Sequence, residues 1–193
     1  MLFGTPHSEV PFDWSSDEKY LIFDQAGAKM DIMYLRRNQD GRGYESLPFV
    51  KTAFDELAPD LSPDDRFLAY ESDKSGRYEI HVQPFPDGGT EWPVSVKGGR
   101  QPRWRGDGKG LYYVENDNTL VAVSVSTTPT FSVGAPNRLF QDERAFRGRG
   151  HQYDVARDGQ RFVVVKTLKQ PKTQIRVVQN WFAQFKEQQR ANP

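Results

Sequence analysis

Four aspartates recur along the chain and are the first candidates for chemistry: Asp17, Asp64, Asp107 and Asp158. Their spacings are 47, 43 and 51 residues, and an apolar run follows each of them. Carboxylates gathered in one place could bind a cation, whereas an Asp in a tight turn accepts hydrogen bonds from backbone amides. The regular recurrence favours the turn, because Gly108 and Gly159 directly follow two of these aspartates.

In the first two repeats the residue after the Asp is Glu18 or Asp65 instead of Gly. These residues are less suited to positive φ than Gly, so we expect those two turns to differ in type from the others. Neither segment resembles an EF-hand calcium loop, which needs a longer series of ligands and a late Glu.

Six basic residues are candidates for binding an anion or an acidic protein partner: Arg100, Arg103, Arg144, Arg147, Arg149 and His151. Four of them lie in segment 141–154, which also contains glycines and an aromatic residue. The alternative is a solvated loop whose charges serve solubility. All six fall between repeats, so we expect them to share one face, with Glu9 and Glu56 making its rim mixed in charge.

Motifs for catalysis and metal binding give little support to an enzyme. The chain has no Cys, and its three histidines, at positions 7, 81 and 151, lack the spacing of a zinc site. There is no GxSxG elbow. A carboxylate pair of the glycosidase kind stays open, because Asp and Glu are plentiful. We expect no cofactor and no metal site.

The elements that position these residues also repeat. Segments WSSDEKYLIF, LSPDDRFLAY, WRGDGKGLYY and VARDGQRFVV align on the four aspartates. An alternating strand follows each of them, at residues 30–35, 78–85, 119–125 and 173–181. A further strand follows in three of the four units. Units of about four strands with this period predict β-propeller blades; the alternative is a β-sandwich with accidental similarity.

Composition agrees with a folded β-protein. Of the 193 residues, 13% are aromatic, and 16 Gly and 13 Pro indicate many turns. The formal net charge is zero, from 26 basic and 26 acidic residues, which argues against a general nucleic-acid binder. No apolar run approaches the length of a membrane span. The first 13 residues lack the features of a signal peptide.

Large apolar residues precede the Asp turns, among them Trp14 and Trp104. Leu61 and Val155 stand at the equivalent positions, so burial explains all four residues whereas ring stacking on a ligand explains only two. We therefore predict that both tryptophans pack between blades.

The repeat, an SxDG-like turn followed by an aliphatic–aromatic strand and an alternating strand, resembles the TolB-type propeller repeat, a relative of the WD repeat. The resemblance covers residues 5–181. Residues 61–89 and 101–114 also resemble the C-terminal propeller of bacterial receptor-type serine/threonine kinases. In that family the propeller lies outside the cytoplasm, so the resemblance implies a periplasmic or extracytoplasmic location.

This chain departs from that pattern in three respects. It carries no kinase motifs, no membrane span, and four repeats where such propellers usually have six to eight. We therefore expect a piece of a larger protein, with sheet edges that a closed ring would protect. The fourth unit also lacks an outermost strand after Trp181. The prediction is either a tight four-blade ring, or open faces that favour self-association or binding to the missing half of the propeller.

The sequence thus predicts an all-β, single-domain propeller or propeller fragment over residues 1–185. The four expected blades are residues 5–53, 54–98, 99–141 and 150–181, and a C-terminal tail follows at residues 182–193. Residues 181–190 are compatible with a short helix. The expected function is non-catalytic binding of a protein, a peptide or a small ligand. The alternatives are a propeller hydrolase or lyase acting at the central channel, and a structural fragment with no function of its own.

Overall fold

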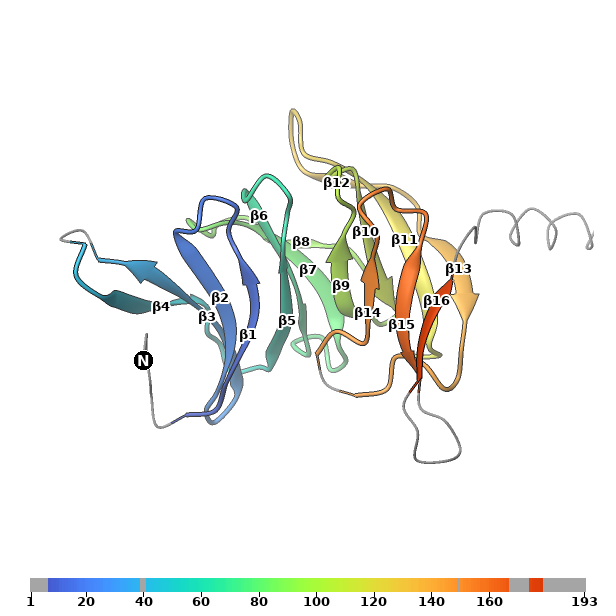
Figure 1. The fold of residues 1–193 in the computed structure, drawn as a ribbon, viewed down its shortest axis with the longest axis horizontal. Helices are drawn as coiled ribbons and strands as arrows, with labels where there is room; N and C mark the ends of the chain where they lie inside the picture. The colour runs from blue at the N-terminus through green and yellow to red at the C-terminus, as the bar shows by residue number, and fades with distance from the viewer. Residues whose placement is uncertain (1–6, 39–40, 149, 167–173, 179–193) are drawn as a thin grey trace, which may run out of the picture.

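The computed structural model describes residues 7–38, 41–148, 150–166 and 174–178. In these residues the secondary structure is all β, arranged in four antiparallel sheets that follow one another along the chain (Figure 1). This confirms the predicted propeller-type blades. The predicted helix at 181–190 lies outside the described residues. No helix in the described part of the chain is long and apolar enough to cross a membrane.

Sheets 1 and 2 have the same simple order, in which each strand pairs with the next. Sheet 1 consists of β1 (Glu9–Trp14), β2 (Tyr20–Ala26), β3 (Met30–Arg37) and β4 (Tyr44–Val50). Sheet 2 consists of β5 (Glu56–Leu61), β6 (Phe67–Ser72), β7 (Glu79–Pro84) and β8 (Trp92–Pro93).

Sheet 3 has five strands, because β12 and β13 both pair with β11. Its strands are β9 (Arg100–Trp104), β10 (Gly110–Val114), β11 (Thr119–Ser126), β12 (Ser132–Val133) and β13 (Asn137–Gln141). Sheet 4 has three strands in the described residues: β14 (Tyr153–Val155), β15 (Phe162–Lys166) and β16 (Gln174–Val178).

Each sheet packs on the next through its own apolar core. Side chains of sheets 1 and 2 form one buried cluster around Ile22 and Tyr70. A second cluster joins sheets 2 and 3 around Trp104, and a third joins sheets 3 and 4 around Phe162. Strands with neighbours on both faces are buried throughout, as β6 and β10 show. The half-buried alternation predicted for the strand at 78–85 is therefore wrong for Glu79–Val82, where four successive residues are buried.

The four Asp turns have one common geometry. Each Asp carboxylate accepts a hydrogen bond from the backbone N–H two residues later, and the four donors are Lys19, Arg66, Lys109 and Gln160. The residue after the Asp has φ near +60° to +70° whether it is Glu18, Asp65, Gly108 or Gly159. The expected difference in turn type is therefore wrong. The backbone constraint of the hairpin outweighs the cost of a left-handed L-residue.

The two tryptophans before the turns have different environments. Trp104 is 7% exposed, and its indole Nε1–H donates to the Asp60 carbonyl of the preceding sheet at 3.1 Å. Trp14 is 50% exposed, so the prediction that both are buried is wrong for Trp14. The difference follows from position: Trp104 has a preceding sheet to pack on, whereas Trp14 belongs to the first sheet.

Candidate functional site

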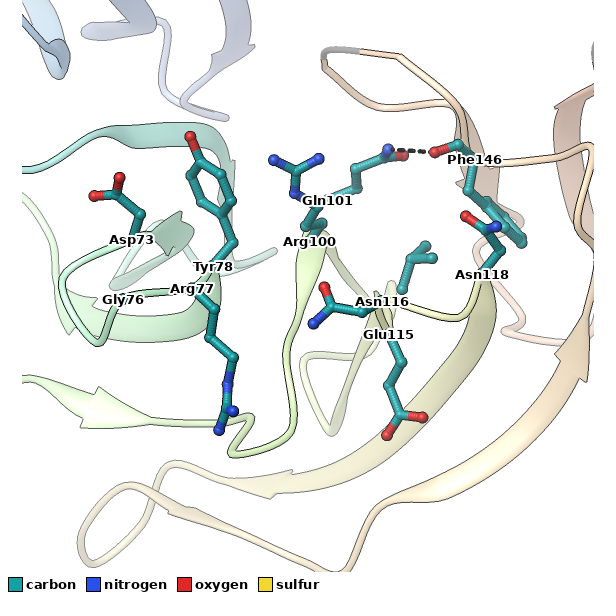
Figure 2. Close-up of a pocket in the computed structure, with 11 residues that line it drawn as sticks. Asp73, Gly76, Arg77, Tyr78, Arg100, Gln101, Glu115, Asn116, Asn118 and Phe146 are labelled. Atoms are coloured by element: carbon teal, nitrogen blue, oxygen red, sulfur yellow. Dashed lines mark hydrogen bonds between the residues drawn. The ribbon is translucent and has the colours of Figure 1, made fainter.

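Two adjoining cavities lie at the end of the sheets that carries the β2–β3, β6–β7 and β10–β11 hairpins. The smaller, about 370 Å³, lies between sheets 2 and 3 (Figure 2). The larger, about 640 Å³, reaches from sheet 1 across the start of β9 to Gly148 and Gly150. Both are lined by Tyr78, Arg100 and Gln101. We call the two cavities together the groove.

Arg100 stands where the two cavities meet. It is the first residue of β9, and its side chain is 45% exposed. Its guanidinium carbon lies 4.2 Å from the centre of the Tyr78 ring, a cation–π contact; Figure 2 shows the two side chains beside each other. Its Nε is 3.9 Å from the Glu71 carboxylate. The guanidinium is thus oriented from two sides while almost half of the side chain stays exposed.

Gln101, next to Arg100, fixes the floor of the groove. Its backbone has φ +56°, and its N–H donates to the Glu71 carboxylate at 3.2 Å. The side-chain amide donates to the Phe146 carbonyl at 3.2 Å (Figure 2) and accepts from the Gln152 N–H at 2.9 Å. The Gln101 carbonyl accepts from the Tyr153 hydroxyl at 2.8 Å. One buried residue therefore connects sheets 2, 3 and 4 below Arg100.

Two buried acids, Asp24 and Glu71, line the larger cavity. Each lies seven residues after the Asp of its turn, and each accepts an N–H from the inner strand of the next sheet, from Ala58 and Gln101 respectively, at 3.2 Å. Burial raises the pKa of Asp24 to about 8, and the Glu71 charge adds to the effect. Burial also raises the pKa of Glu71 to about 7, although Arg100 and the Gln101 amide oppose it.

Asp24→Asn is expected to remove a loss of stability that the wild type undergoes as pH rises from about 4 to about 8. The folded-state pKa near 8 exceeds the ordinary 3.8, so the folded protein binds more protons between these values and stability falls as pH rises through this window. Asn stays neutral and can still accept the Ala58 N–H. Between about pH 6 and 8, the unfolding free energy of the wild type should fall relative to the variant by up to about 1.4 kcal/mol per pH unit.

Urea denaturation at a series of pH values measures this difference between the two proteins. Parallel curves for wild type and Asp24→Asn would show that the Asp24 carboxyl titrates in the folded protein as it does in the unfolded chain.

The structure separates the basic residues that the sequence grouped together. Arg103 is not in a loop: it lies within β9, where it forms an ion pair with Asp60 at 2.6 Å and lies 3.8 Å from Asp154. His151 is largely enclosed; its Nε2 lies 2.9 Å from the Pro102 carbonyl, and its ring meets Phe12 edge-on. Burial, helped by the Arg103 charge, lowers the pKa of His151 to about 3. Both positions contradict the expectation of a shared solvent-facing loop.

Arg144 and Arg147 are exposed on the segment between sheets 3 and 4, at the groove end of the sheets. The Arg147 Nε donates to the Glu143 carbonyl at 2.7 Å. Arg149 lies outside the described residues. Glu56 does not contribute to the rim as expected, because it is buried and accepts hydrogen bonds from Thr52 and Ser72.

The four turn aspartates lie in the hairpins that join the first and second strands of each sheet. The groove lies beside hairpins that join second and third strands, so the aspartates are at the opposite end of the sheets. Asp64 and Asp107 instead border a shallow cavity of about 360 Å³ between turns. Within the described ranges, no group of three His, Asp or Glu side chains could hold a metal ion.

Structural comparison identifies the architecture. The chain superposes on TolB from Acinetobacter baumannii with a TM-score of 0.64 and 16% identity, over 93% of this chain and 43% of that one. The fold is a TolB-like β-propeller. A putative TolB from Agrobacterium tumefaciens (TM-score 0.55, 14% identity, 93% of this chain and 80% of that one) and puromycin hydrolase (0.59, 14%, 92% and 28%) are also similar.

These identities carry information on the fold alone. By sequence, no family model and no curated protein matches. The chain spans less than half of the A. baumannii TolB that it matches.

Sequence reasoning missed most of the groove. It selected Arg100 but not Tyr78, Gln101, Asp24 or Glu71. A signal existed for the two acids, because a carboxylate occupies the same strand position in the first two repeats, where the third and fourth have Val. Gln101-Pro102 aligns with Ala58-Pro59 of the second repeat, where φ is +51°, so the repeat marks this backbone position. Nothing in the sequence marks the contacts of the Gln101 amide.

Proposed function

We propose that this protein is a non-catalytic propeller module that binds an acidic segment of a partner protein in the groove. The observation that carries the proposal is Arg100, an exposed guanidinium held in place by Tyr78 and Glu71 where two cavities meet. A guanidinium oriented in advance binds a carboxylate with little loss of side-chain entropy. Arg144 and Arg147, exposed at the same end, add positive charge along the approach.

The wall opposite Tyr78 suits a peptide. Asn116 and Asn118 line the smaller cavity from the β10–β11 hairpin (Figure 2), and side-chain amides can hydrogen-bond both the N–H and the carbonyl of an extended chain. Asp73 and Glu115 line the same cavity. The groove is thus mixed in charge, which favours a segment with one carboxylate at Arg100 over a uniformly acidic chain.

The setting of such a module follows from resemblance. The sequence of residues 61–89 resembles the extracytoplasmic propeller of bacterial receptor kinases, and the fold is TolB-like. The kinase resemblance supports a sensing or interaction role outside the cytoplasm.

An enzyme is the second candidate, because Asp24 and Glu71 have raised pKa values beside a cavity, and puromycin hydrolase has a similar propeller. The hydrogen bonds of these acids argue against it. Each carboxyl already accepts a backbone N–H from the next sheet. The second oxygen of Asp24 is buried. Both acids therefore serve the junction between sheets.

The test is peptide binding with and without the guanidinium. Immobilised peptides containing Asp or Glu, each matched by an Asn or Gln version, are probed with wild type and with Arg100→Ala. The acidic peptides should bind wild type, and the variant should bind about 10- to 150-fold more weakly, because a charge-assisted hydrogen bond contributes about 1.5–3 kcal/mol. Added salt should weaken the wild-type complex.

The matched control is Arg66→Ala, which removes an Arg at the opposite end of the sheets, where it pairs with Asp64. It should leave peptide binding unchanged. Equal binding of acidic and amide peptides, or equal loss in both variants, contradicts the proposed groove.

A further inference from the structure

The junction between sheets 2 and 3 shows how one blade holds the next. The Asp60 carboxylate accepts the Trp104 backbone N–H at 2.6 Å, and the Asp60 carbonyl accepts the Trp104 indole N–H at 3.1 Å. The Trp104 ring belongs to the same buried cluster as Ala69, on the second strand of the earlier sheet. An Asp, a Trp and a small aliphatic residue therefore form this junction.

The junction between sheets 1 and 2 uses the same positions. One oxygen of the Asp13 carboxylate accepts the Leu61 backbone N–H at 2.8 Å. The other oxygen accepts the backbone N–H of the next residue, Trp14, also at 2.8 Å. Leu61 shares a buried cluster with Ile22 of the earlier sheet. At both junctions, the Asp of the earlier sheet thus accepts a backbone N–H from the first strand of the later sheet.

Sheet 4 presents the first half of this junction with no sheet after it in the described residues. Asp154 stands at the position of Asp13 and Asp60, and its Oδ1 accepts the N–H of its own neighbour Val155 at 2.8 Å, as the Asp13 carboxylate does with Trp14. The side chain is 72% exposed. Val163, at the position of Ala69, is 39% exposed where the residues of the other three sheets are buried.

Sheet 1 presents the second half. Trp14 stands at the position of Trp104 and is 50% exposed. The exposed residues at the two ends, Asp154, Val163 and Trp14, are therefore an Asp, a small aliphatic residue and a Trp, and Asp154 also lies 3.8 Å from Arg103 of its own copy. This is the same combination as Asp60, Ala69 and Trp104.

The hairpin turns add charge complementarity. At the junction of sheets 1 and 2, the backbone N–H and hydroxyl of Ser16 donate to the Asp65 carboxylate on the next turn. The equivalent residues at the two ends are Arg157 on sheet 4 and Glu18 on sheet 1, both exposed. A basic and an acidic side chain would thus meet where Ser16 and Asp65 meet inside the chain.

We propose that sheet 1 of one copy of this protein docks on sheet 4 of a second copy through this junction. Trp14 then packs on Val163, and its indole N–H donates to the Asp154 carbonyl as the Trp104 indole does to Asp60. Its backbone N–H, which the Asp13 carboxylate accepts within one copy, donates to the Asp154 carboxylate instead, while Glu18 pairs with Arg157. The contact is head-to-tail, so each copy has one donor end and one acceptor end. Figure 1 shows sheet 1 at the left of the view and sheet 4 towards the right, where it overlaps sheet 3. The proposal does not depend on the peptide-binding groove.

Light scattering over a concentration series tests the contact by complementation. Wild type should self-associate, and Trp14→Ala and Asp154→Ala should each raise the dissociation constant by at least about tenfold, the loss of a central interface anchor. An equimolar mixture of the two variants should form a heterodimer, because Asp154→Ala keeps an intact Trp14 end and Trp14→Ala keeps an intact Asp154 end. Both residues are exposed, and melting curves verify folding.

Disulfide cross-linking provides the second readout, since the chain has no cysteine. Glu18→Cys mixed with Arg157→Cys should give a covalent heterodimer under mild oxidation, whereas either variant alone should give little. Wild type that stays monomeric at every concentration overturns the proposal, as does equal cross-linking of each variant with itself. The proposal is also overturned if the chain stays monomeric and the Trp14 ring becomes buried, as measured by fluorescence, in a longer polypeptide that carries further blades. Those blades would then cover Trp14 in place of a second copy.

Discussion

Trp104→Ala is expected to destabilise the protein by about 3–5 kcal/mol, the range for truncating a buried Trp in a core. The ring is 7% exposed and packs in the cluster that joins sheets 2 and 3. Its removal also leaves the Asp60 carbonyl without the indole donor. Such a loss is a large part of the total stability of a typical domain. Denaturant titration followed by circular dichroism measures it.

Trp14→Ala is the matched control, because it removes the same side chain from the equivalent position of sheet 1. At concentrations where the protein is monomeric, it should cost far less, since Trp14 is half exposed. We attribute the contribution of Trp104 to the free energy of unfolding to its burial against the preceding sheet. Equal losses at the two positions would contradict this and would place the contribution in the local strand.

The strands could be predicted because they repeat. Each repeat carries the same turn and the same alternation, and those local signals specify a blade whatever its neighbours are. The predictions that failed concerned the burial of side chains, which depends on contacts between different blades. Trp14 and Trp104 stand at equivalent positions but have unequal neighbours, and Arg103 is partly enclosed because Asp60, 43 residues earlier, faces it.

The groove could not be read from the sequence for the same reason. Asp24, Glu71 and Arg100 come from three different sheets, and only the packing of those sheets places them around one cavity. The sequence did select Arg100, as a basic residue between two repeats. Its contact with Tyr78 depends on the β6–β7 hairpin folding towards the next blade.

Asp60→Ala is expected to cost about 3–5 kcal/mol, as when one partner of a buried ion pair is removed. Asp60 is buried, with Arg103 at 2.6 Å from one oxygen and the Trp104 N–H at 2.6 Å from the other. The variant leaves the Arg103 guanidinium partly enclosed without its nearest counter-charge. Asp154 cannot replace it, because it lies 3.8 Å from Arg103 and is mostly exposed.

A double-mutant cycle separates the ion pair from the backbone hydrogen bond. Asp60→Asn keeps an acceptor for the Trp104 N–H but removes the charge, and Arg103→Met keeps the apolar stem but removes the guanidinium. If the pair carries the effect, the two losses should be strongly non-additive, and the double variant should be more stable than their sum predicts. Additive losses of unfolding free energy in the two single variants would show that Asp60 acts only as the acceptor of the Trp104 N–H in β9. Glu45→Ala, in the exposed pair with Arg36, is the control and should have a much smaller effect.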